Sequence, residues 1–306
     1  MRKHLVLVIG LVALAILIVA FRKPFKGWYR GYTLDVSTGR FQDPEGLAVD
    51  AAGNIYVADE DWQRLTVLDP DGKTLVTFQE VDGYTVDGKS LPITTGDSLV
   101  ALGKGHLMII AQFNLAELRI HDGKVSLVRV CGDFGDPEGI ARDPKTGDIY
   151  ITDEDNRRIQ VFDASGVLQH GWPVPQDPEG ICVTKDRVYV TFSKDDWVGC
   201  YDKAGKLRFR FGERGTGPGQ LRNPDYVCVA PDGLLYVTDQ KNDRIQVFDS
   251  EGRHRRSIGG RGTGPGRFRD PEDLAFDTAG NLVVADGGNH RIQVLTQGGK
   301  PLRVFE

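Results

Sequence analysis

A short segment recurs along the chain, and its spacing limits the possible folds more than any other feature. Five clear copies contain Asp-Pro-Glu or Asn-Pro-Asp, and they begin at Asp43, Asp136, Asp177, Asn223 and Asp270. Their prolines are separated by 93, 41, 46 and 47 residues. Because 93 residues is about two periods, we expect a disguised copy between the first two, at Thr95–Val100. The chain therefore contains six repeat units of the length typical of stacked or radial architectures.

Each unit has the pattern of four short β-strands separated by turn residues. In the first unit we expect strands at Gly46–Asp50, Asn54–Ala58, Leu65–Asp69 and Leu75–Phe78. Six such sheets bury their faces only against each other, so the sequence predicts an all-β, six-bladed β-propeller at residues 39–306. Either residues 32–36 or residues 302–306 can complete the final blade.

The N-terminus carries a separate signal, because residues 5–21 are an unbroken run of 17 apolar or Gly residues. As a helix this run would span about 26 Å, close to the hydrocarbon thickness of a bilayer. Ile18-Val19-Ala20 matches a signal-peptidase site poorly, which favours an uncleaved transmembrane anchor over a removed signal peptide. We expect a flank at 1–4, the anchor at 5–21 and a juxtamembrane linker at 22–38, with the propeller outside the cytoplasm, periplasmic or extracellular.

Charge argues against nucleic acid as a partner. The formal net charge is -5, but the first 30 residues hold six Lys or Arg and no Asp or Glu, so the remainder is more acidic still. Binding to phosphate backbones needs clustered Lys and Arg. The sequence also lacks the common hydrolase, zinc-protease, calcium-loop and dinucleotide-binding motifs.

Two of the units resemble a known repeat. Ile149–Asp153 followed by Asn156–Asp163, and likewise Leu235–Asp249, are similar to the NHL repeat, as are the loops Gly215–Gly219 and Gly262–Gly266. The resemblance covers about residues 39–306 and implies an NHL-type propeller. It leaves the activity open, since NHL propellers include protein-binding, RNA-binding, sensor and lyase members.

Comparison of the units identifies four charge pairs. The second strand ends in Asp and an Arg stands five residues later, which gives the pairs Asp59 and Arg64, Asp153 and Arg158, Asp239 and Arg244, and Asp286 and Arg291. Two units lack both partners, with Gln112 and Glu117 in one and Phe192 and Trp197 in the other. Partners that are kept or lost together indicate structural ion pairs.

A second position is acidic in all six units, directly after the repeat proline. Its members are Glu45, Asp97, Glu138, Glu179, Asp225 and Glu272. They precede the innermost strands, so we expect them to surround one mouth of the axial channel. A subset could hold a divalent cation, and all-oxygen ligands favour Ca²⁺ or Mg²⁺. The alternative is that each carboxylate serves its own turn.

The loops after the second strands are expected to reach the same mouth. Their aromatic, polar and acidic residues define a ligand-binding rim of Trp62, Phe113, Asn114, Phe192, Asp196, Trp197 and His290. Aromatic side chains beside carboxylates suit a cationic or sugar-like ligand. The alternative is that the repeat sequence simply diverged in these blades and that the aromatic residues bind no ligand.

These features predict a membrane-tethered NHL propeller that acts as a binding or sensing module. Its acidic axial face is expected to bind a protein, a peptide or a small cationic ligand. The alternative is a metal-dependent hydrolase or lyase that uses the carboxylates, because Glu-Gly at the start of an inner strand resembles the metal-binding Glu-Gly-Pro of gluconolactonase-like propellers. Leu47 and Ile140 replace that proline, and the histidine ligands of the peptide-amidating lyase have no counterpart, so this resemblance extends only to Glu45, Glu138 and Glu179.

Overall fold

Six β-sheets, each built from strands that are consecutive in the chain, make up the part of the protein that the structure describes. This computed structural model describes residues 40–86, 89–92, 98–103, 105–111 and 113–306. The chain divides into two units, Met1–Thr38 and Gly39–Glu306, and the sheets belong to the second. The expected membrane helix at residues 5–21 lies outside the described residues. Within those residues, no helix combines the length and the apolar character needed to cross a bilayer.

Blades 1 to 3 follow in chain order. Blade 1 contains β1 (Pro44–Val49), β2 (Ile55–Asp59), β3 (Arg64–Leu68) and β4 (Thr74–Phe78). Blade 2 contains β5 (Glu80–Val86), β6 (Lys89–Pro92), β7 (Leu99–Gly103), β8 (His106–Ala111), β9 (Asn114–His121) and β10 (Lys124–Cys131). Blade 3 contains β11 (Pro137–Arg142), β12 (Ile149–Asp153), β13 (Arg158–Phe162) and β14 (Leu168–Pro173).

Blades 4 to 6 each add a short 3₁₀ turn, η, after the second strand. Blade 4 contains β15 (Ile181–Val183), β16 (Arg187–Phe192), η1 (Ser193–Asp195), β17 (Trp197–Asp202) and β18 (Leu207–Phe211). Blade 5 contains β19 (Pro224–Val229), β20 (Leu235–Asp239), η2 (Gln240–Asn242), β21 (Arg244–Phe248) and β22 (His254–Gly259). Blade 6 contains β23 (Pro271–Phe276), β24 (Leu282–Asp286), η3 (Gly287–Asn289), β25 (Arg291–Leu295) and β26 (Pro301–Phe305).

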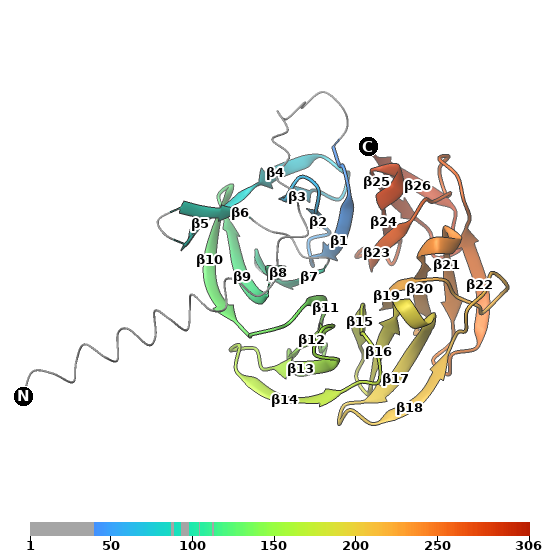
Figure 1. Ribbon diagram of the computed structural model, residues 1–306. Coiled ribbons are helices and arrows are strands. Elements are labelled where there is room, and N and C mark those ends of the chain that lie inside the picture. The colour runs from blue at the N-terminus through green and yellow to red at the C-terminus, as the bar shows by residue number, and fades with distance from the viewer. Residues whose placement is uncertain (1–39, 87–88, 93–97, 104, 112) are drawn as a thin grey trace, which may run out of the picture. The chain divides into compact units, whose positions relative to one another are not determined.

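The predicted six-bladed β-propeller is confirmed. The innermost strands β1, β7, β11, β15, β19 and β23 surround a common centre, and each contacts the next (Figure 1). The ring closes where β1 packs against β23 and β24. Strand β26 (residues 301–305) completes the last blade. It corresponds to the C-terminal segment, one of the two segments that the sequence offered for this position. The other candidate, residues 32–36, lies outside the described residues.

Apolar side chains fill the space between neighbouring blades. Six buried clusters occur, and each joins residues from two adjacent sheets. Between blades 4 and 5, for example, Val198 and Val237 are fully buried in one cluster. Burial of such a side chain contributes about 1.5–3 kcal/mol, so stacking of the blades is the main driving force for the fold.

Blade 2 differs from the prediction by one additional hairpin. Strands β5 and β6 extend its outer edge, and β5 pairs in parallel with β10. The sequence carried a signal for this hairpin, because Asp87-Gly88 separates two short runs with β-forming residues. The hairpin was not predicted, because we assigned four strands to every repeat unit.

The four Asp and Arg pairs form, and each lies within one hairpin. In three blades, Nε of the arginine lies 2.7 Å from Oδ2 of the aspartate, as in Arg158–Asp153, Arg244–Asp239 and Arg291–Asp286. In blade 1 the Arg64–Asp59 distance is 3.7 Å, and the Arg64 guanidinium stacks on Trp62 instead. The aspartate side chains have 0% exposure. In blade 6 the Arg291 side chain is also buried, so loss of one partner of that pair costs about 3–5 kcal/mol.

These pairs also position the loops around them. Oδ1 of the aspartate accepts a hydrogen bond from a backbone N–H just before the inner strand, for example from Arg269 to Asp286 at 2.8 Å. The arginine donates to carbonyls of the loop between blades: Arg291 bonds the carbonyl oxygens of Gly264 at 3.0 Å and Arg267 at 2.9 Å. A single pair therefore fixes both the acidic turn and the inter-blade loop.

Blade 4 replaces the ion pair with an aromatic pair in the same register. Phe192 faces Trp197 across the hairpin, just as Asp153 faces Arg158 in blade 3. The two rings stack with centroids 4.0 Å apart and planes 17° apart. Stacking of two buried rings keeps the hairpin closed without any charge.

Candidate functional site: the acidic face

One face of the propeller gathers the repeated carboxylates. The acidic residue after each repeat proline stands at the start of an inner strand. In blades 1, 3, 5 and 6 the ladder shifts register there, between Pro44 and Leu47 in blade 1. A bulge of this kind turns the acidic residue out of the regular alternation. We use the term acidic face for these turns and the loops after the second strands.

Two blades bring three carboxylates together. In blade 1, one ligand oxygen from each of Asp43, Glu45 and Glu60 lies within 4.8 Å of the others. In blade 3 the equivalent residues are Asp136, Glu138 and Glu154. The sequence predicted one member of each trio, Glu45 and Glu138, as a metal ligand, and the other two members of each trio were not predicted. The signal was available, because only these two of the units have both Asp-Pro-Glu and a Glu directly after the second strand.

Two of the remaining predicted carboxylates accept side-chain hydrogen bonds, and the residue Asp225 contacts blade 4 through its backbone. Ser193 Oγ donates to Glu179 Oε2 at 2.5 Å, and the Gln240 amide donates to Glu272 Oε2. The backbone carbonyl of Asp225 accepts from Thr191 Oγ1 at 2.6 Å. Asp97 lies outside the described residues. The expectation that the six carboxylates surround one mouth of the axial channel therefore stays a prediction. The side-chain hydrogen bonds tie Glu179 to Ser193 of its own blade and Glu272 to Gln240 of blade 5.

A tyrosine connects the inner strands of two blades that are not neighbours. Tyr226 on the inner strand of blade 5 directs its hydroxyl to the carbonyl of Ile140 in blade 3, at 3.4 Å. Gly180, which occupies the same repeat position as Tyr226, lies between them in blade 4; a Cβ there would lie 2.8 Å from Tyr226 Cα. The Tyr226 side chain therefore extends from blade 5, past Gly180 of blade 4, to blade 3.

Lysines in the loops neutralise part of the acidic face. Lys194 contacts Glu154 and Asp177, and Lys241 contacts Asp270 at 2.9 Å. Although burial opposes it, hydrogen bonds from Lys194 and Arg157 hold the pKa of Asp177 below its usual value. The repeat pattern does not predict these partners, because neither lysine belongs to the repeated Asp and Arg pairs.

At the boundary between blades 6 and 1, burial and neighbouring carboxylates raise the pKa values of two carboxyl groups. Burial raises the pKa of Glu272 to about 7; the hydrogen bond from Gln240 opposes this rise, and the charges of Asp43 and Asp270 add to it. Burial, followed by the charges of Asp61 and Asp59, also raises the pKa of Asp43. Carboxylates that raise each other's pKa favour a bound cation.

The predicted aromatic rim is wrong for two of its members. Phe192 and Trp197 are 0% and 5% exposed and belong to the apolar cluster between blades 3 and 4. They stack on each other and cannot contact a ligand on the surface. Phe113 is 37% exposed, and Asn114 begins β9 beside it.

Three other rim residues have structural contacts. Trp62 lies under the Arg64 guanidinium. Asp196 Oδ1 accepts the Asn223 backbone N–H of blade 5 at 2.8 Å. His290 Nδ1 contacts the carbonyl of Gln42 in blade 1. Asp196 and His290 stand at the same repeat position, so they act as connections between adjacent blades.

The repeat itself can now be identified. Residues 41–68, 134–162, 221–248 and 268–295 match the pattern of the NHL repeat. The propeller carries NHL repeats. The four matched segments are those with the Asp and Arg pair, in blades 1, 3, 5 and 6, and the NHL match omits the two blades that lack it.

Two curated proteins are similar to this NHL propeller in part of their sequence. The chain is 29% identical over 150 residues to NHL repeat-containing protein 3 of Mus musculus, covering 44% of this chain and 39% of that protein. It is 27% identical over 139 residues to Protein brain tumor of Drosophila melanogaster, covering 44% of this chain and 13% of that one. The aligned segments thus span about two fifths or less of these relatives.

Solved structures extend the likeness to most of the chain. A streptogramin B lyase superimposes with a TM-score of 0.59 at 16% identity, over 87% of this chain and 83% of the lyase. A structural genomics protein from Bacteroides thetaiotaomicron superimposes with a TM-score of 0.65 at 13% identity, over 85% and 70%. At this level of identity the likeness concerns the fold alone.

The raised pKa of Glu272 predicts a pH-dependent contribution to stability. Because the pKa is about 7 in the folded protein and 4.5 for an ordinary Glu, this group's contribution is complete below about pH 4.5 and is lost as the pH rises through 7. We expect Glu272→Gln to be more stable than the unaltered protein at pH 8 by roughly 1–2 kcal/mol, and not at pH 4.5. Thermal melts at both pH values measure this. The exposed Asp122→Asn serves as the control, and an equal gain for both variants would contradict the assignment.

Proposed function

We propose that the protein is a membrane-tethered binding module whose acidic face receives a Lys- or Arg-rich segment of a partner protein. The observation that carries this proposal is the clustering of Asp43 and Glu272, whose carboxyl groups have raised pKa values at the boundary of blades 6 and 1. A peptide or a small cationic ligand would use the same chemistry. The NHL repeats are consistent with a protein partner.

Electrostatics supports the blade 6 and blade 1 boundary as the docking position. Glu60 and Asp61 follow β2 on this side and are exposed, so a partner's side chains can reach them. Asp43 and Glu45 lie within the same trio as Glu60. A charge of +1 at about 4 Å from a carboxylate near a protein surface gains about 1–4 kcal/mol. Several such contacts give a specific, salt-sensitive interaction.

Binding of a basic peptide tests the proposal. We expect a fluorescent Lys-rich octapeptide to bind, and the double variant Asp43→Asn/Glu60→Gln to weaken its affinity by about fivefold or more at low salt, because two carboxylates are removed. Fluorescence anisotropy at pH 8 measures the affinity. The double variant Asp122→Asn/Glu251→Gln removes two negative charges elsewhere and should change the affinity less than twofold. An equal effect of the two double variants would contradict a defined docking position.

The tether is a second part of the proposal. Residues 5–21 are long and apolar enough to anchor the chain in a membrane, with the propeller on the outer side. We expect the full-length chain to stay with membranes during alkaline carbonate extraction. Val12→Lys/Ile16→Lys should release it, since two charges would lie at the centre of the span. Release of the unaltered chain would contradict the anchor.

A divalent cation is the second candidate, and the two trios are the observation that favours it. Three oxygens within 4.8 Å of one another form a partial ligand set of the kind that Ca²⁺ or Mg²⁺ uses. A bound cation at this position would also be the requirement for the alternative activity, a metal-dependent hydrolase or lyase. Lys194 competes for Glu154, so the blade 1 trio suits a cation better than the blade 3 trio.

Thermal melts with and without added cation separate the two functions. We expect 5–10 mM Ca²⁺, about the range for weak sites, to raise the melting temperature if the trios bind it. Glu45→Gln/Glu138→Gln should then abolish the rise. Glu179→Gln is the matched control, because Glu179 stands at the same repeat position but bonds to Ser193. No response to Ca²⁺, Mg²⁺, Mn²⁺ or Zn²⁺ would remove support for the enzyme alternative.

A further inference from the structure

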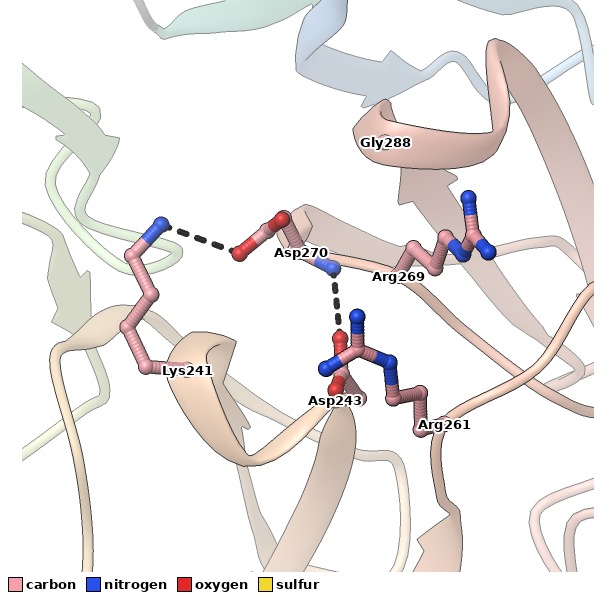
Figure 2. Close-up of a pocket in the computed structure, with 6 residues that line it drawn as sticks. All are labelled: Lys241, Asp243, Arg261, Arg269, Asp270 and Gly288. Atoms are coloured by element: carbon pink, nitrogen blue, oxygen red, sulfur yellow. Dashed lines mark hydrogen bonds and ion pairs between the residues drawn. The ribbon is translucent and has the colours of Figure 1, made fainter.

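A cavity of about 430 Å³ lies at the boundary between blades 5 and 6, apart from the two trios. Its lining residues are Lys241, Asp243, Arg261, Arg269, Asp270 and Gly288. Figure 2 shows that they come from the η2 loop, the inter-blade loop, the turn before β23 and η3. Arg261 and Arg269 thus line a pocket among the loops of the acidic face.

The backbone holds both arginines in place. The Arg269 N–H donates to Asp286 Oδ1 at 2.8 Å, and its carbonyl accepts from the Gly288 N–H at 3.0 Å. Arg261 forms a β-bridge with Phe268, and Gly262 donates to the Phe268 carbonyl at 3.0 Å. Their side chains therefore extend from fixed main-chain positions.

Some charged side chains in the pocket have polar partners and others do not. Lys241 Nζ lies 2.9 Å from Asp270 Oδ1, and Asp243 Oδ1 accepts the Asp270 N–H at 3.1 Å. Across the described residues, neither the Arg261 nor the Arg269 guanidinium forms a hydrogen bond or an ion pair, and no dashed line reaches either one in Figure 2. Three cationic and two anionic side chains leave one net positive charge in the pocket.

The preceding boundary gives an internal comparison. Between blades 4 and 5, Arg214 and Arg222 stand at the positions of Arg261 and Arg269. There, Arg214 Nε is 3.8 Å from Asp196 Oδ2, and Lys241 takes the place of Gly288. At Gly288 no side chain is present, and a Cβ would lie 3.0 Å from Arg269 Cβ. The absence of a side chain leaves the pocket open at this boundary.

We propose that this pocket binds a carboxylate group from an acidic peptide segment, with Arg261 and Arg269 as the donors. Guanidinium groups bind carboxylates through paired N–H donors. The single net positive charge matches a monoanion, whereas a phosphate dianion would meet Asp243 and Asp270 without enough compensation. The site goes beyond the proposed function, because its ligand has the opposite charge and it occupies another boundary of the propeller.

A labelled hexaglutamate peptide tests the site on the full-length protein, kept in nonionic detergent because of the apolar residues 5–21. We expect binding by fluorescence anisotropy at low salt, although the protein is acidic. Arg261→Gln and Arg269→Gln should each weaken the affinity by about tenfold, because each removes a charge-assisted hydrogen-bond donor. Arg214→Gln and Arg222→Gln change the net charge equally and should alter it less than twofold.

Three results would overturn the proposal. The first is no binding of the peptide to the unaltered protein. The second is an equal loss of affinity in all four variants, which would indicate long-range electrostatics only. The third is binding of inorganic phosphate, dependent on Arg261 and Arg269, without binding of the peptide. Thermal melts of each variant verify the fold, and the control variants carry the same type of substitution.

Discussion

The carboxylate that ends the second strand in four of the blades connects three parts of the fold. Asp286 accepts the backbone N–H of Arg269 ahead of β23 and pairs with Arg291, and Arg291 holds the carbonyls of the loop between blades 5 and 6. Because Asp286 is fully buried, its charge must be satisfied inside the protein. The acidic turns and the pocket therefore depend on this buried ion pair for their positions.

Departures from the repeat create the differences around the ring. Phe192 and Trp197 replace the ion pair at no cost to the register, because stacked rings bridge the same two strands. Tyr226 replaces a glycine and reaches Ile140. Gly288 replaces a lysine and opens a pocket. These changes fall at different positions around the ring, and the symmetric scaffold thus carries two different charged surfaces.

The two surfaces differ in how their charge is balanced. At the boundary of blades 6 and 1, Asp43 and Glu272 have raised pKa values because of burial and of neighbouring carboxylates. At the boundary of blades 5 and 6, Lys241 pairs with Asp270 and two guanidinium groups face the cavity. A partner with both basic and acidic segments would match this arrangement, since each surface attracts the opposite sign.

The sequence by itself determined the number of blades, the four-stranded pattern that five of them follow, and the Asp and Arg partners, because these features repeat and depend on local spacing. It also identified Glu45 and Glu138, although not the other two carboxylates at either site. Only the tertiary structure decided that Phe192 and Trp197 are buried, that Lys194 and Lys241 neutralise their neighbours, and that three carboxylates meet in blade 1 and three in blade 3. These outcomes depend on which side chains of adjacent blades meet. The repeat shows where each blade lies in the sequence, but it does not show which side chains touch across the boundary between two blades.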